Sequence, residues 1–287
     1  MKKLLLIGVG LIASSIARDV KRLALADEVI GIDTDLDNLH TALSLKIIDR
    51  GSIVLEEDTV KGVDCIILAV PLLQFMQVLK KLSQLPLKEN CLLTDVASVK
   101  APVAALYQRF FNDRLEWCVP VHPIAGTELS GAAAGRAYLF NEKKTIICPL
   151  QKNQSEALNQ VKEFWQALGS IPIEMDAERH DYLLGAASHL PQLLASTYMA
   201  GIEEEAIALG GSGFRDFTRI AASNPAMWVG IGIENRQVLI ELLSLFEQDL
   251  TQLKKLLQSA DQEGLQKFFT KAQAKRQAQN GKIIGEQ

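Results

Sequence analysis

The chain has 287 residues, of which 48% are hydrophobic and 22% charged, and its formal net charge is −4. This balance is typical of a soluble globular protein and offers no basic surplus for binding nucleic acid. No apolar stretch is long enough to span a bilayer, so we expect no membrane segment. The length suits one large or two medium domains.

The first 33 residues predict a strand, a glycine turn, a helix and a second strand. An apolar run over residues 4–7 comes first, and apolar residues then recur at helical spacing up to residue 20. A second apolar run covers residues 29–32 and ends on Asp33. Gly8 and Gly10 lie in the turn after the first run. This order of elements, with an acid after the second strand, is the context that a dinucleotide-binding fingerprint requires.

Each part of this fingerprint has a physical role. Gly8 allows the tight turn, and Gly10 lets the backbone approach a pyrophosphate. The pyrophosphate would sit at the positive start of the helix, where Leu11 and Ile12 lie. Asp33 would accept hydrogen bonds from the adenosine ribose and repel a 2′-phosphate. We therefore expect the cofactor to be NAD rather than NADP.

Two alternatives explain the same stretch. One is a glycine-rich turn in some other doubly wound protein. The other is a secretory signal, because Lys2 and Lys3 precede an apolar run and small residues. Cleavage near Ala17 would destroy a complete βαβ unit, so we reject the signal.

Strand and helix patterns alternate up to residue 175. Helices are predicted over residues 36–45, 73–82 and 155–168, and strands over 65–70, 91–96, 145–149 and 171–175. The alternation predicts an α/β fold with one mostly parallel sheet.

Several polar or conformationally special residues follow the predicted strands. Val70 and Pro71 come at the end of one strand, Ser98 follows the next, and His122 follows a short third strand. In an open α/β sheet these carboxyl ends face the ligand crevice. We therefore expect Val70 and Pro71 beside the cofactor, with Ser98 and His122 in the same crevice.

The pattern changes at Asp176, after which no strand is predicted. A long helix is expected over residues 176–199, bent at Pro191. A last long helix over 235–257 carries a heptad-like series of apolar residues, here termed the heptad series: Leu239, Leu242, Phe246, Leu250, Leu253 and Leu257. We place a domain boundary at Asp176, where the pattern changes. This gives a dinucleotide-binding domain over 1–175 and a helical domain over 176–287.

The cysteines and histidines show no metal-binding pattern. The four cysteines are scattered in or beside apolar runs, and no CxxC pair or Cys/His cluster is present. We expect reduced, buried thiols in a cytoplasmic protein and no metal. For His40 and His180 the sequence gives no supporting context, and we expect solvated positions.

The chain resembles the prephenate/arogenate dehydrogenase family of tyrosine biosynthesis. Four blocks carry the resemblance, in family order: GVGLIASS, TDVASVK (94–100), HPIAGTELSG (122–131), and SHLPQ (188–192) with GFRDFTRIAASNP (213–225). The resemblance implies a Rossmann-like domain, an all-helical dimerisation domain and a homodimer. It also implies NAD-dependent oxidative decarboxylation of a cyclohexadiene, prephenate or arogenate.

The resemblance also assigns roles to individual residues. His122 would be the base that takes the hydroxyl proton, and a neutral imidazole suits that role. Ser98 would bond the substrate hydroxyl and orient the histidine, and the alternative for this residue is a plain helix N-cap. Arg219 would hold a substrate carboxylate with its guanidinium fork. Thr127 and Glu128 would lie on a mobile loop beside the substrate.

Two residues near the predicted bend are further candidates for substrate binding. Gln192 stands where several prephenate-specific members carry a histidine, and it adds no positive charge, which weakens the choice of prephenate over arogenate. His189 is a lesser candidate for substrate binding and suits a structural role. The heptad series has two readings, burial inside the helical domain or a dimer interface.

Two other functions stay open at this point. A β-hydroxyacid dehydrogenase shares the two-domain plan but needs a lysine on the helical domain, and no lysine occurs between Lys162 and Lys254. A non-catalytic NAD-sensing protein would leave His122 and Ser98 unexplained.

Overall fold

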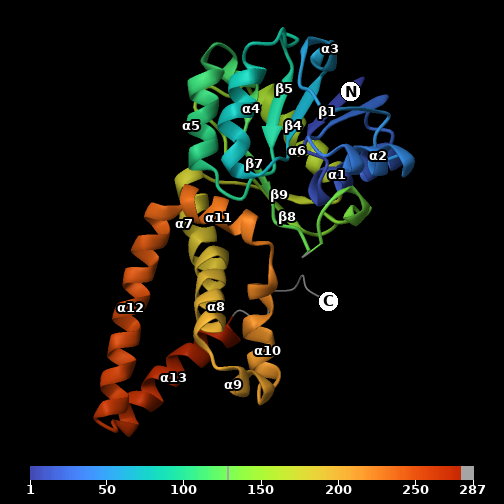
Figure 1. The fold of residues 1–287 in the computed structure, drawn as a ribbon. Helices are drawn as coiled ribbons and strands as arrows, with labels where there is room; N and C mark the ends of the chain where they lie inside the picture. The colour runs from blue at the N-terminus through green and yellow to red at the C-terminus, as the bar shows by residue number, and fades with distance from the viewer. Residues whose placement is uncertain (128, 279–287) are drawn as a thin grey trace. The chain divides into compact units, whose positions relative to one another are not determined.

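The computed structural model describes residues 1–127 and 129–278, and it opens with a six-stranded parallel sheet. The strand order is β3-β2-β1-β4-β5-β6 (Figure 1). The bounds are β1 Lys3–Ile7, β2 Glu28–Ile32, β3 Arg50–Ser52, β4 Cys65–Leu68, β5 Leu92–Asp95 and β6 Cys118–Val119. The expected Rossmann-like topology is confirmed.

Helices cover both faces of this sheet, so alternate residues of β1 enter different cores. Leu4 and Leu6 face one core, and Leu5 and Ile7 face the other. The first core is completed by α1 (Leu11–Arg22) and α6 (Ser155–Ala167), and the second by α4 (Phe75–Leu82) and α5 (Ala101–Phe110). Two shorter helices, α2 (Leu36–Ser44) and α3 (Glu57–Val60), follow β2 and β3.

A second sheet departs from the expectation of one continuous sheet. Its three strands are β7 (Val121–Pro123), β8 (Lys144–Ile147) and β9 (Ile171–Glu174), in the order β7-β8-β9. β7 runs antiparallel to β8, and β9 runs parallel to it. Pro120 separates β6 from β7 and has no N–H to donate, so the ladder of the first sheet ends there.

A π-helical turn interrupts the helical segment that follows the sheets, just before Pro191, where a bend was expected. α7 (Ala177–Leu184) runs into a π-helical turn, Gly185–His189, and α8 (Leu190–Gly201) begins directly after it with Pro191 in its first turn. The proline offers no N–H to the carbonyl four residues earlier, which lies inside the π-helical turn. Shorter elements follow: α9 (Glu204–Ala208), α10 (Ser212–Thr218), a 3₁₀ turn (Arg219–Ala222) and α11 (Pro225–Glu234).

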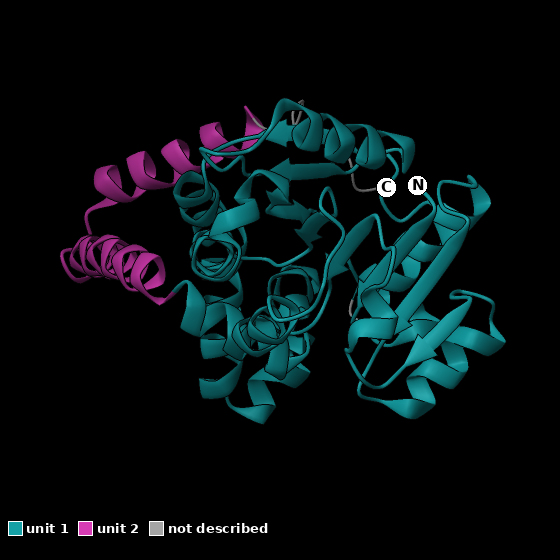
Figure 2. Cartoon of the chain, turned by 90° about the horizontal axis from the view of Figure 1, so that it is seen from above, with its two compact units in different colours: residues 1–235 teal, residues 236–287 magenta. Residues whose placement is uncertain are grey.

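The chain divides into two compact units after Asn235. Residues 1–235 form one unit and residues 236–287 the other (Figure 2). Within its described part the second unit contains α12 (Arg236–Gln258) and α13 (Gln262–Gln277), and Asp261 caps α13 by accepting a hydrogen bond from Gly264 N. The predicted boundary at residue 176 lies inside the first unit and stays a prediction.

Across residues 1–127 and 129–278, no helix combines the length and the apolar character needed to cross a membrane.

Candidate active site

The glycine turn after β1 fits a dinucleotide. Gly8 has a φ of +90°, and a Cβ there would lie 2.6 Å from the carbonyl oxygen of Ala69. The position therefore requires glycine, and it places the turn against Ala69 and Val70, just beyond β4. Pro71 is exposed at the start of the following turn.

The start of α1 is open for an anion. Gly10 is the N-cap residue, it provides no side-chain cap, and nothing lies within 4 Å of the Cβ it lacks. The first backbone N–H groups of α1, including those of Leu11 and Ile12, have no partner within their own helix. Free N–H groups at a helix N-terminus suit a pyrophosphate, so these residues fit NAD at this end.

Asp33 belongs to a hydrogen-bonded network beside the glycine turn. Its Oδ2 accepts hydrogen bonds from Val9 N at 2.9 Å and from Asn38 Nδ2 at 3.0 Å. Asn38 Nδ2 also donates to Val9 O at 3.0 Å, and Asn38 Oδ1 accepts from Ala132 N at 2.7 Å. Asn38 therefore ties Asp33 to Ala132, the residue that directly follows the 122–131 block. Asn38 was not predicted from the sequence, where its only signal is a polar residue in the first turn of the helix after β2.

His122 is held by a buried histidine and a buried aspartate. Its Nδ1 lies 2.8 Å from His180 Nε2, and His180 Nδ1 lies 2.8 Å from Asp181 Oδ1. His180 is fully buried, and Asp181 is 3% exposed. The expectation of a solvated His180 was therefore wrong. Because α7 packs on α5, His180 faces inward, a contact that no local pattern reveals.

Burial and nearby positive charge keep both imidazoles neutral. Desolvation lowers the pKa of His122 well below its usual range, and His180, Lys100 and His189 lower it further. Desolvation also lowers the pKa of His180, although its hydrogen bond to Asp181 opposes that change. A neutral imidazole at physiological pH has a lone pair available for a proton.

A buried ion pair lies beneath His122. Lys100 and Asp95 are both fully buried and bonded to each other, and Lys100 Nζ donates to Val121 O at 2.6 Å. Asp95 Oδ2 accepts from Tyr107 OH and Val121 N, each at 3.3 Å. The pair thus joins the end of β5 to β7 and fixes the backbone that carries His122.

The other candidate residues on loops are Ser98, Thr127 and Glu128, and none of those described is bonded to His122. Ser98 is half-buried between β5 and α5, and the described residues contain no hydrogen bond between its hydroxyl and His122. Thr127 is half-buried, and its Oγ1 accepts Leu129 N at 3.3 Å. Glu128 lies outside the described residues.

The helical segment brings Arg219 and Gln192 to neighbouring elements. Arg219 is exposed in the 3₁₀ turn after α10, and this turn packs against α8, which carries Gln192. Gln192 is 4% exposed, and its Nε2 donates to Ser196 Oγ at 3.3 Å. His189 is 2% exposed, and its Nδ1 lies 3.1 Å from Asn235 Nδ2, which suits a structural role.

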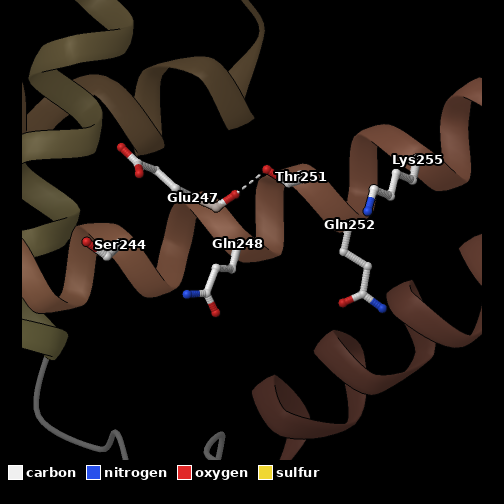
Figure 3. Close-up of a pocket in the computed structure, with 6 residues that line it drawn as sticks. All are labelled: Ser244, Glu247, Gln248, Thr251, Gln252 and Lys255. Atoms are coloured by element: carbon white, nitrogen blue, oxygen red, sulfur yellow. Dashed lines mark hydrogen bonds between the residues drawn. The ribbon is translucent and has the colours of Figure 1, made fainter.

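Other parts of the described chain offer no competing centre. A hollow of about 610 Å³ runs along α12, lined by Ser244, Glu247, Gln248, Thr251, Gln252 and Lys255 (Figure 3). Its lining has no pair of groups suited to alcohol oxidation. In residues 1–127 and 129–278 no group of three metal-ligating side chains is found. The four cysteines are buried and free, and burial raises the pKa of Cys91, Cys118 and Cys148 to about 12.

Two family models match adjacent parts of the chain. The model of the prephenate dehydrogenase nucleotide-binding domain matches residues 16–173, and that of the prephenate dehydrogenase dimerisation domain matches residues 176–271. The chain belongs to the prephenate dehydrogenase family. It is therefore an oxidoreductase, and the expected resemblance is confirmed.

The similarity to known proteins covers almost the whole chain. A prephenate dehydrogenase of Lactococcus lactis is 31% identical over 97% of this chain and 77% of its own length. A cyclohexadienyl dehydrogenase of Zymomonas mobilis is 31% identical over 96% of each chain. A crystal structure of prephenate dehydrogenase from A. aeolicus, in complex with hydroxyphenyl propionate and NAD+, has a TM-score of 0.88 and 32% identity over 97% of this chain and 98% of that one. Together with the glycine turn, these findings support NAD as the cofactor.

Proposed function

We propose that this chain catalyses the NAD-dependent oxidative decarboxylation of prephenate to 4-hydroxyphenylpyruvate. The observation that carries the proposal is the setting of His122. Its ring is half-buried, its Nδ1 is bonded to His180, and its Nε2 has no described hydrogen-bond partner. The family supplies the substrate class, and the glycine turn with Asp33 supplies the cofactor site.

The reaction needs a base and an electron acceptor at one alcohol. The substrate is a cyclohexadiene with a carboxylate on a quaternary ring carbon and a hydroxyl on the opposite carbon. Bound NAD+ supplies the acceptor for the hydride from the hydroxyl-bearing carbon. The hydroxyl proton passes to Nε2 of His122 as the carbonyl forms. When CO2 leaves the quaternary carbon, the electron pair of the broken C–C bond moves through the ring to the carbonyl oxygen, which takes the proton back from His122. The ring is then aromatic, which drives the step forward.

Other residues of this chain would bind and orient the substrate. Ser98 lies between β5 and α5, where its hydroxyl would bond the ring hydroxyl. The exposed guanidinium of Arg219 would grip a carboxylate in a bidentate pair. Thr127 would border the entrance, and Glu128, the other loop candidate, lies outside the described residues. Gln192 and His189 would contribute from α8 and the turn before it, with Gln192 closer to the substrate and His189 supporting the turn.

Arogenate is the second candidate substrate. The neutral amide of Gln192 adds no positive charge for the prephenate side chain, and the Zymomonas relative is named a cyclohexadienyl dehydrogenase. The deciding experiment follows NADH formation with NAD+ and each cyclohexadiene, and compares the two values of kcat/KM. A higher value with prephenate supports the proposal, and a higher value with arogenate replaces prephenate by the second candidate. No NADH with either substrate would contradict both.

We also propose that the protein is a cytoplasmic homodimer. The match to a dimerisation domain supports a dimer, as does the heptad series on α12, where Leu250 is 48% and Leu257 is 60% exposed. Burial of such apolar side chains against a second copy of the chain would stabilise a dimer. Four reduced, buried cysteines suit the cytoplasm. Light scattering of the purified protein tests the dimer, and a monomeric mass would contradict it.

A further inference from the structure

We propose that His180 and Asp181 are positioning residues that keep the proton of His122 on Nδ1 and so leave Nε2 as the proton acceptor. The inference rests on the proposed function only in giving Nε2 a substrate proton to accept. The arrangement of the three side chains carries the inference by itself.

The hydrogen-bonded series Asp181–His180–His122, here termed the relay, starts at a carboxylate that the backbone holds in place. Asp181 Oδ1 accepts Lys100 N at 2.7 Å, and Asp181 Oδ2 accepts Ala101 N at 2.8 Å. These N–H groups belong to the N-cap residue and to the first residue of α5, which has no side-chain cap of its own. Asn235 Nδ2 donates to the backbone carbonyl of Asp181 at 3.0 Å. The carboxylate therefore has a fixed place, and each oxygen acts as an acceptor.

The donors and acceptors then follow in one direction. Asp181 accepts, so His180 carries its proton on Nδ1 and presents the Nε2 lone pair to His122. The contact between the rings therefore needs a proton on Nδ1 of His122. A neutral imidazole has a single N–H, so Nε2 of His122 has the free lone pair. The opposite tautomer would bring two lone pairs together between the rings.

The hydrogen bond between His122 and His180 is kept when His122 accepts a proton and becomes positively charged. The imidazolium keeps its Nδ1–H bond to His180, and the negative charge of Asp181 lies at the far end of that ring. Lys100, His189 and His180 itself lower the pKa of His122, and Asp95 offsets Lys100 through their buried ion pair. The relay therefore fixes the tautomer of His122 rather than raising its pKa.

A fixed tautomer is worth a large factor in rate. In the Ser-His-Asp triad, replacing the aspartate by asparagine turns the histidine to the wrong tautomer and lowers kcat about 10⁴-fold. Here one further imidazole separates the carboxylate from the base, and solvent or substrate can partly restore the tautomer. We therefore expect a loss of about 10- to 100-fold when the relay is broken.

Two variants of His180 separate positioning from packing. His180→Leu removes the acceptor for His122 Nδ1–H, so kcat should fall about 10- to 100-fold, while KM for prephenate and for NAD+ change less than about threefold. His180→Gln keeps an oxygen acceptor at the same reach and should restore most of kcat. His40→Leu, at an exposed site on α2, is the matched control and should behave as wild type.

A second measurement needs neither substrate nor cofactor. Nitrogen-15 NMR of the ligand-free protein reports which ring nitrogen of His122 carries the proton. We expect the Nδ1–H form in wild type and in His180→Gln, and a mixture in His180→Leu. A wild-type His122 with its proton on Nε2 would overturn the relay, and so would an unchanged tautomer and kcat in His180→Leu. If wild type failed to oxidise prephenate, the proposed function would fail, while the NMR result would still decide on the relay.

Discussion

Val9 N donates a hydrogen bond to Asp33 Oδ2 across 2.9 Å, which ties the acid after β2 to the glycine turn after β1. Asp33 Oδ1 accepts Asp35 N at 3.0 Å, so both carboxylate oxygens are held by the backbone. The acid therefore stands in a fixed position beside the predicted pyrophosphate site.

This fixed carboxylate predicts the cofactor preference. Asp33→Ser removes both the acceptor for the ribose hydroxyls and the negative charge that repels a 2′-phosphate. We expect the ratio of kcat/KM for NAD+ over NADP+ to fall by at least about tenfold, because a lost charge-assisted hydrogen bond costs roughly 1.5–3 kcal/mol. Asp37→Ser, on the exposed first turn of α2, serves as the control. An unchanged ratio in Asp33→Ser would refute the assignment of this acid.

The base assignment is tested at His122 itself. His122→Asn keeps a polar, though smaller, side chain that cannot take a proton at neutral pH. Turnover with prephenate should fall by at least about 100-fold, while the affinity for NAD+, measured by calorimetry, stays near wild type. His40→Asn is the matched control on an exposed surface. Near-wild-type turnover in His122→Asn would remove this residue from its proposed role.

The carboxylate grip is tested at Arg219. The guanidinium would bind a substrate carboxylate in the ground state as well as in the transition state, so Arg219→Ala should mainly raise KM for prephenate. We expect a rise of at least about tenfold, the equivalent of one lost charge-assisted pair. Arg215 lies one turn earlier, and its Nη1 donates to Gly210 O at 3.4 Å, so Arg215→Ala makes a close comparison. A larger effect at Arg215 would exchange the two assignments.

Elements with strong local signals could be predicted from the sequence. The first strand was expected over residues 4–7 and covers Lys3–Ile7, because buried parallel strands are continuously apolar. The glycine turn also has a local cause, since only glycine suits the φ of +90° at position 8. By contrast, β3 is a short polar edge strand, Arg50–Ser52, and has no apolar alternation to reveal it.

The supporting shell of the site could not be predicted, because it consists of contacts between distant residues. Asp181 bonds Lys100 from 81 positions away, and Asn38 bonds Ala132 from 94 positions away. His180 appears in the sequence as a polar residue in a helix beside other charged residues, which resembles a solvated face. Only the packing of α7 on α5 turns it toward His122. The block HPIAGTE predicted His122 as the base, but no local sequence feature indicated that His180 and Asp181 would contact it.

The buried histidines predict how stability depends on pH. Desolvation lowers the pKa of His189 from 6.5 to about 4. The unfolded chain therefore binds more protons than the folded one between about pH 6.5 and 4, so stability is complete above that window and falls as the pH drops through it. At pH 5 this one residue should account for about 2 kcal/mol. Urea unfolding at pH 7.5 and 5.0 should show a smaller decrease in His189→Asn than in wild type or in His40→Asn. Equal decreases in all three proteins would contradict the prediction.

Asn38 gives a prediction that separates cofactor binding from loop positioning. Its amide nitrogen donates to Asp33 and to Val9 O, and its oxygen accepts from Ala132 N. Asn38→Asp keeps the acceptor for Ala132 but sets a second carboxylate beside Asp33, so we expect Kd for NAD+ to rise about 10- to 100-fold with little change in KM for prephenate.

Asn38→Ala removes the acceptor as well, so the end of the 122–131 block loses its anchor. We expect KM for prephenate, measured at saturating NAD+, to rise at least about fivefold in this variant, because one lost hydrogen bond to a buried backbone N–H costs about 1–3 kcal/mol. Calorimetry gives Kd for NAD+, and Asn112→Ala, at an exposed side chain, is the control. The two Asn38 variants should therefore differ in KM for prephenate. Equal KM values in both would show that the bond to Ala132 has no part in holding the substrate loop.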